Sequence, residues 1–140
     1  MRNAVARLVA PVSLGIILSL APASPTEAVA AQFGCRGDAL GLTTIGGDVR
    51  GGFRIQCDVK MDYLVVKADL FYPYSSITRT TKQCYNAYSC VAYPLKANPA
   101  GLQLWTVNAF QAEGTKGGTE TGCGWYTYND MTCTQAQRSL

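Results

Sequence analysis

The chain contains no histidine among its 140 residues, and this absence excludes several kinds of catalytic site. Ser-His-Asp and Cys-His hydrolysis both need an imidazole to carry a proton, as does ribonuclease chemistry that relies on histidine. Zinc sites with histidine ligands and pH switches based on histidine are excluded for the same reason. An enzyme built on this sequence would have to work with carboxylates, lysines or tyrosines.

Charge is also scarce, at 15% of residues, and the formal net charge is only +3. Basic residues are not clustered, so the sequence lacks the electrostatic pattern that binds nucleic acid or anionic membranes. Neither a Cys-x-x-Cys pair nor an Asp-x-Asp calcium loop occurs, and the glycines around Lys116 do not have phosphate-loop spacing. We therefore expect no nucleic-acid partner, no metal and no cofactor.

Long apolar runs are missing as well. The longest, Leu8–Leu20, has 13 residues and contains Pro11, whereas a membrane span needs about 20. It follows a basic start and precedes the small-x-small pattern Ala28–Ala30, which is typical of a secretory signal peptide. We expect residues 1–30 to be removed, leaving one domain, 31–140, that is secreted to the extracellular space without a membrane anchor.

Cysteines are the most informative residues present, because all six follow the predicted signal peptide: Cys35, Cys57, Cys84, Cys90, Cys123 and Cys133. An even set in an exported domain indicates about three disulfides, in one of 15 connectivities. Spacing favours sequential pairing, with Cys84–Cys90 closing a short loop and Cys123–Cys133 closing a terminal hairpin. The alternative joins Cys57 to Cys84 or Cys90 across the core.

The clearest secondary-structure signal is strict alternation of apolar and polar residues over Phe53–Asp62, which predicts a half-buried strand. Between Leu64 and Tyr72 the apolar residues have the opposite parity, so a turn or bulge is needed near Met61–Tyr63. We interpret the two runs, Gly52–Met61 and Tyr63–Tyr72, as two strands that pair with each other.

Other segments complete an all-β pattern of short strands and glycine turns. Strands are expected at Leu40–Ile45, Val91–Leu95 and Leu102–Ala112, a connection or edge strand at Ser75–Lys82, a mobile loop at Gly114–Gly122 and a hairpin at Gly124–Thr132. The pattern predicts a single antiparallel sandwich, of the immunoglobulin-like type.

Three segments resemble small secreted actinobacterial disulfide-bonded β-sandwich proteins, mostly of unknown function. They are the alternating strand with an inward cysteine, Phe53–Val59, the close cysteine pair in Lys82–Cys90, and the glycine-started strand Gly101–Ala109. The resemblance covers roughly Asp48–Ala112. It implies an immunoglobulin-like sandwich and a released protein, and it implies no catalytic residue.

Aromatic residues in predicted loops are the main candidates for a binding site. Rigid, amphipathic rings suit stacking on sugars or anchoring a protein partner. The candidates are Tyr85, Tyr88, Trp125, Tyr126 and Tyr128, near a further pair, Tyr72 and Tyr74. The competing interpretation is that these rings cover the ends of the sandwich or pair across strands. We hypothesise a non-catalytic domain that binds an extracellular protein or polysaccharide.

Two alternative functions fit the same sequence. One is a proteinaceous inhibitor or toxin-like effector that presents the Cys84–Cys90 loop on a rigid scaffold. The other is a small hydrolase that uses the carboxylates of Asp58, Asp62 or Asp69. Asp58 and Asp62 share a strand face about 13 Å apart, beyond the carboxyl separations of glycosidases, about 5–9.5 Å. A cross-strand ion pair with a nearby lysine explains these acids more simply.

Overall fold

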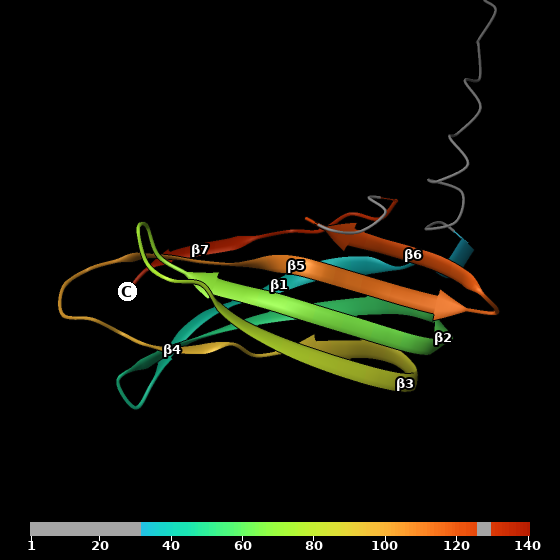
Figure 1. Ribbon diagram of the computed structural model, residues 1–140, viewed down its shortest axis with the longest axis horizontal. Coiled ribbons are helices and arrows are strands. Elements are labelled where there is room, and N and C mark those ends of the chain that lie inside the picture. The colour runs from blue at the N-terminus through green and yellow to red at the C-terminus, as the bar shows by residue number, and fades with distance from the viewer. Residues whose placement is uncertain (1–31, 126–129) are drawn as a thin grey trace, which may run out of the picture.

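The structure, a computed structural model, describes residues 32–125 and 130–140. These residues form seven strands: β1 (Arg36–Ile45), β2 (Asp48–Phe71), β3 (Thr78–Ala92), β4 (Leu95–Ala97), β5 (Leu104–Lys116), β6 (Thr119–Gly124) and β7 (Ala136–Ser139). All belong to one antiparallel sheet (Figure 1). The all-β prediction is confirmed, and the immunoglobulin-like type stays a prediction. Within the described ranges, no helix is long and apolar enough to cross a membrane.

The central element is β2, a strand of 24 residues. Its first half pairs with β1 and its second half with β5, while β3 follows it along the other side. The register against β3 shifts between Gln56 and Met61, which marks a bend. The prediction of two separate, paired strands in this region is therefore wrong. Of the two alternatives predicted near Met61–Tyr63, a turn or a bulge, the structure has the bulge. A change of parity is produced equally by a turn and by a bend, and here the backbone continues through the bend.

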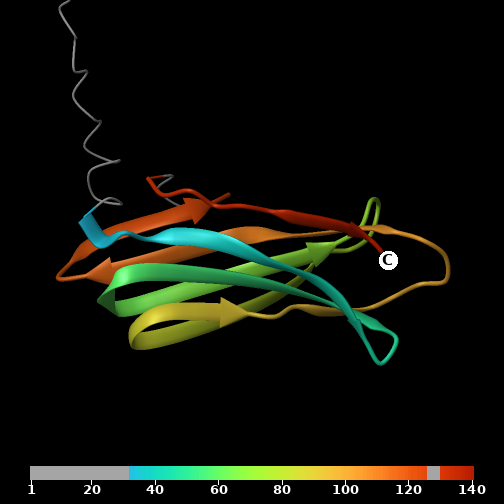
Figure 2. The ribbon, with the colours of Figure 1, turned by 180° about the vertical axis from the view of Figure 1, so that it is seen from behind.

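The bend lets the two halves of the sheet pack face to face, in the manner of a sandwich. Figure 2 shows β1 crossing over β5, which it contacts. One core cluster gathers around Phe53, Ile55 and Leu64, and a second around Trp105 and Val107. The apolar residues of both halves of β2 thus point into the same interior despite their opposite parity.

Gly51 lies at a close approach of the two layers. A Cβ atom at this position would lie 2.8 Å from a methyl carbon of Val107, on the facing strand β5. We expect Gly51→Ala to lower the free energy of unfolding by about 1–3 kcal/mol, the usual cost of overpacking a core. Adding Val107→Ala should recover part of that loss in a denaturant-unfolding series. Strictly additive effects of the two changes would contradict this explanation.

All three disulfides follow the predicted sequential pairing: Cys35–Cys57, Cys84–Cys90 and Cys123–Cys133. The first joins the chain before β1 to β2, and the last joins β6 to the segment that leads to β7. The second was predicted to close a short loop, and this is wrong, because both of its cysteines lie within β3. It links the two sides of the bend in that strand, where Asn86 has a φ of 49°.

Three local predictions can be compared with the strands. Ser75–Lys82 is in large part edge strand, one of its two predicted forms. Gly114–Gly122 was expected to be a mobile loop, and this is wrong: β5 and β6 pair across it with Gly117 and Gly118 at the turn. Backbone hydrogen bonds, which need no apolar side chain, stabilise that hairpin. The predicted Gly124–Thr132 hairpin falls largely on residues 126–129, outside the described residues.

Candidate functional site

A cavity of about 240 Å³ lies on the outer face of the sheet, where β2, β3 and β5 run side by side. We call it the outer-face pocket. Its lining combines four apolar side chains, Phe71, Ile77, Phe110 and Trp125, with the charged pair Asp69 and Arg79. Such a combination of concave apolar surface with a few fixed polar groups is typical of a binding site.

The ion pair that lines the pocket follows from the register of the β2–β3 hairpin. Asp69 and Arg79 are direct partners across β2 and β3. The guanidinium donates two hydrogen bonds to the carboxylate, Nε to Oδ1 at 2.6 Å and Nη2 to Oδ2 at 2.8 Å. These bonds raise the pKa of the Arg79 guanidinium above its usual range. Asp69 is only 5% exposed, and the guanidinium neutralises its charge within the site.

Phe110 reaches the pocket because of an irregularity in β5. The register of β5 against β2 shifts between Lys67 and Ala68, and Phe110 is the residue that the shift leaves over. Its ring lies under the Arg79 guanidinium carbon, 3.3 Å from the ring centroid. A bulge commonly redirects a side chain in this way. The ring and the ion pair therefore hold the guanidinium plane from two sides.

Trp125 forms the exposed wall. It follows β6, and its N–H donates a hydrogen bond of 3.0 Å to the carbonyl of Phe110. Gly124 permits this approach, since it has a φ of 125° and a Cβ there would lie 2.6 Å from the Phe110 oxygen. The Trp125 side chain is 81% exposed although it lines the pocket. The backbone thus holds a large, solvent-facing ring beside a cavity.

Asn108 supplies a polar group at the same place. It is the β5 partner of Asp69, so it completes a row with Arg79 across three strands. Its Oδ1 is buried, and no described residue donates a hydrogen bond to it. An unpaired buried oxygen costs free energy.

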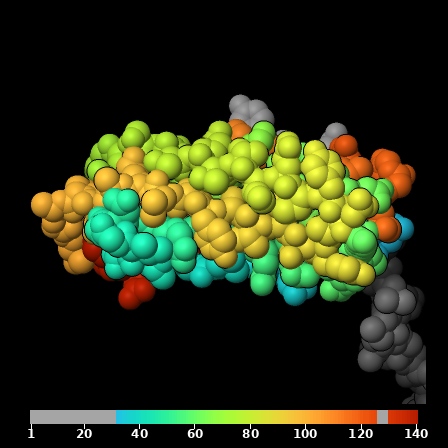
Figure 3. All heavy atoms as spheres, turned by 90° about the horizontal axis from the view of Figure 1, so that it is seen from below, coloured from blue at the N-terminus to red at the C-terminus, as the bar shows by residue number. Residues whose placement is uncertain are grey.

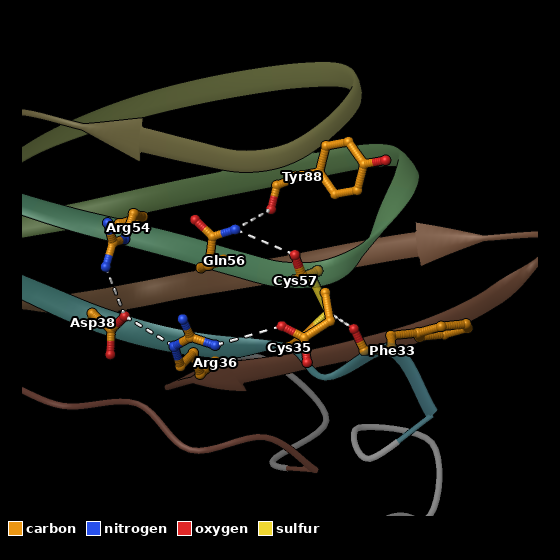
Figure 4. Close-up of polar contacts among 9 residues, drawn as sticks. Phe33, Cys35, Arg36, Asp38, Arg54, Gln56, Cys57 and Tyr88 are labelled. Carbon is orange, nitrogen blue, oxygen red and sulfur yellow. Dashed lines mark hydrogen bonds and ion pairs between the residues drawn. A yellow bond between two sulfur atoms is a disulfide. The ribbon is translucent and has the colours of Figure 1, made fainter.

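The other predicted aromatics lie elsewhere. Tyr85 is 66% exposed on β3, six residues beyond Arg79 and hence about 20 Å from the pocket. Its ring pairs with Tyr63 of β2 at 5.2 Å, as the competing interpretation proposed. Tyr88 is 54% exposed at the bend, where Figure 4 shows its ring directed away from Gln56. Tyr126 and Tyr128 are outside the described residues.

The Tyr63–Tyr85 pair carries a testable pH dependence. Burial, followed by the proximity of Tyr85, raises the pKa of the Tyr63 phenol above 10. The unfolded chain then ionises first, so stability that is intact below about pH 10 is lost as pH rises through the raised pKa. We expect the free energy of unfolding to fall less steeply above about pH 10 in Tyr63→Phe. The matched control, Tyr93→Phe, should follow the parent chain; identical slopes in all three would contradict the assignment.

The three candidate carboxylates are not brought together. Asp58 forms an ion pair at 3.8 Å with Arg36, which is labelled in Figure 4. Asp62 accepts a hydrogen bond of 2.8 Å from the N–H of Gly117. Asp69 is held by Arg79. In the part of the chain that the structure describes, no three Cys, Asp or Glu residues are placed to hold a metal ion. Each acid has a separate structural partner.

Sequence reasoning missed most of the pocket. Asp69 was considered only as an acid, and Arg79 and Phe110 were not singled out. One signal was present: Pro73 ends the β2 run, and a hairpin centred on Tyr74 sets Asp69 opposite Arg79. Without that register, the two residues are unconnected in sequence. The bulge that exposes Phe110 leaves no comparable signal in the sequence.

Comparison with known proteins gives little further information. No family model matches the chain, and no curated protein matches it. Among solved structures, it is similar to IrmA from Escherichia coli, with 12% sequence identity and a TM-score of 0.36. That match covers 64% of this chain and 83% of IrmA. A likeness at this level supports no conclusion on fold type or function.

Proposed function

We propose that this chain is a secreted, non-catalytic binding domain that anchors an apolar side chain of an extracellular protein partner in the outer-face pocket. The observation that carries this proposal is an exposed Trp125 held beside a largely apolar cavity whose two charged lining residues, Asp69 and Arg79, pair with each other. Tryptophan and arginine are the residue types that most often dominate protein interfaces. Three disulfides are consistent with an extracellular site of action.

The size and lining of the cavity favour a protein side chain over the alternatives. About 240 Å³ is below the roughly 300–1,000 Å³ of small-molecule sites. Four of its lining side chains are large and apolar, and its two charged lining residues pair with each other. A sugar would bring many hydroxyl groups into a cavity where, among the described lining residues, only Asn108 has a buried side-chain oxygen without a hydrogen-bond partner. An aliphatic or aromatic side chain avoids that desolvation cost.

The separate partners of Asp58, Asp62 and Asp69 support the non-catalytic part of the proposal. Carboxylate hydrolysis needs two acids that act on one bond, with one of them held protonated. Here each acid is engaged by its own cation or backbone N–H. The Arg79 guanidinium in particular occupies both carboxylate oxygens of Asp69.

The test is an NMR titration of the oxidised chain with three probes. N-acetyl-leucinamide and N-acetyl-phenylalaninamide present single apolar side chains, and triacetylchitotriose presents a polysaccharide. We expect both amides to shift the resonances of Phe110, Asn108 and the Trp125 indole in a saturable, millimolar range. If chitotriose shifts these resonances and the amides do not, the proposal of a protein partner would be contradicted in favour of a polysaccharide.

Two alanine variants make the titration specific. Trp125→Ala should weaken the amide titration several-fold or more, because it removes the exposed wall. Tyr93→Ala removes a half-exposed ring between β3 and β4 that does not line the pocket, and should leave the titration unchanged. Equal effects of the two variants would show that the amides bind exposed rings in general, and would contradict the proposal.

A further inference from the structure

We infer that the partner binds as an extended strand along the outer edge of β3, and that it places an acidic residue next to Lys82. This inference rests on the proposed function, since the apolar residue in the outer-face pocket belongs to the same strand. It adds the partner's backbone conformation and the spacing of two of its side chains.

Two other edges of the sheet, those of β1 and β6, are each covered in part by the chain itself. Gly37 of β1 exchanges backbone hydrogen bonds with Thr132 and Thr134, at 2.8 and 3.0 Å. The carbonyl of Gly122 in β6 accepts from the N–H of Met131 at 3.2 Å. The segment that follows the described gap therefore hydrogen-bonds to β1 at Gly37 and to β6 at Gly122. Proteins commonly protect edges in this way, because a free edge is a template for another strand.

The first half of β3 is not covered in this way. From Thr78 to Cys84 it pairs with β2 in unbroken register, and no other described strand pairs with it. Figure 3 shows β3, in yellow-green and yellow, at the surface on this side of the molecule. The stretch contains no proline and no bulge, two features that would block strand addition. Its outward backbone groups are available for strand addition.

Lys82 defines which strand can add. It is exposed, and it lies opposite Val66, whose side chain is buried in the core, so Lys82 sits on the inner face at the edge. An inward-facing lysine disfavours an apolar or basic strand, and an acidic residue directly opposite satisfies it. A second copy of β3 brings only Arg79 and Lys82 and no acid. Charge therefore favours a different, acidic segment over self-association.

The pocket and the edge are continuous. Arg79 is on the outer face three residues before Lys82, and Ile77 of the pocket precedes it. A strand added beside β3 lies about 4.8 Å away, so a large side chain opposite Arg79 can extend over Ile77 into the pocket. In an antiparallel addition the acid comes first, and the apolar residue follows three positions later. The expected pattern is acid-x-x-apolar.

The experiment selects binders from a phage-displayed library of random linear peptides of about twelve residues, with the oxidised chain as bait. We expect enrichment of acid-x-x-apolar sequences whose binding depends on Trp125. Lys82→Glu should weaken these peptides roughly tenfold. The matched charge reversal Lys60→Glu, on the exposed bend, should leave them unchanged.

Backbone methylation of a selected peptide tests strand addition directly. N-methyl groups on alternate residues remove the N–H donors of one edge, so one alternating set should abolish binding and the other should have little effect. If the peptides need Trp125 but tolerate methylation of both sets, strand addition would be ruled out while binding in the outer-face pocket would still stand. If binding does not depend on Trp125 but is lost on methylation of one set, strand addition would stand and binding in the outer-face pocket would be ruled out. Enrichment of no Trp125-dependent peptide, or concentration-dependent self-association through β3, would contradict the inference.

Discussion

Replacing Trp105 with alanine is expected to lower the free energy of unfolding by about 3–5 kcal/mol. Its side chain is fully buried between Leu42, Val49 and Val107, and Tyr72 packs edge-on against it at 4.8 Å. Alanine would leave a large cavity in the smaller of the two core clusters, where few other side chains can move in. Because domains of this size are stable by only about 5–15 kcal/mol, this single change should remove a large part of the total.

The chain offers a matched control, because its second tryptophan is exposed. Trp125→Ala makes the same substitution at a side chain that is 81% exposed, and should change stability by no more than about 0.5 kcal/mol. Urea unfolding followed by circular dichroism compares the two without depending on tryptophan fluorescence. A similar loss in both variants would mean that Trp125 belongs to the core, and would remove the outer-face pocket from consideration.

Removing the Cys35–Cys57 disulfide is expected to cost about 3 kcal/mol. The bridge closes a span of 22 residues, and cross-linking destabilises the unfolded chain more as that span grows. It also holds the chain at the start of β1 beside β2, where Arg36 pairs with Gln56. The double change to alanine keeps both buried positions apolar, so the loss reports the cross-link rather than a new buried polar group.

The comparison is with the Cys84–Cys90 bridge, which spans only 6 residues within one strand. Its removal should cost about 2 kcal/mol by the same reasoning, and denaturant midpoints of the two double variants would give the order. A larger loss on removing Cys84–Cys90 would contradict this ranking. It would indicate that this bridge stabilises the bend of β3 itself.

The sequence predicted the elements that depend on local pattern. Alternation placed the strand through Phe53, and spacing gave all three disulfides. The long β2 was missed because a parity change near Met61 has the same signature whether the chain turns back or bends. The β5–β6 hairpin was missed because its polar, glycine-rich sequence lacks apolar alternation. Its strands are joined by backbone pairing and a two-glycine turn.

The candidate site was predictable only in part, for a different reason. Trp125 was predicted as one of several candidate loop aromatics, and its side chain is exposed. Its neighbours come from β2, β3 and β5, and their meeting depends on the hairpin register and on the bulge at Phe110. Tertiary pairing of this kind is not encoded in any single segment. Tyr85 was equally prominent as a sequence feature, yet the register sets it beside Tyr63 instead.

The most direct test of the outer-face pocket is the affinity of N-acetyl-phenylalaninamide for three forms of the oxidised chain. These are the parent, Trp125→Ala and Tyr85→Ala, titrated under the same conditions. A pocket at Phe110 and Trp125 predicts binding that is weakened several-fold or more by Trp125→Ala and unchanged by Tyr85→Ala. The reverse order would place the binding surface on the Tyr63–Tyr85 side of β3, and would contradict the pocket as the functional site.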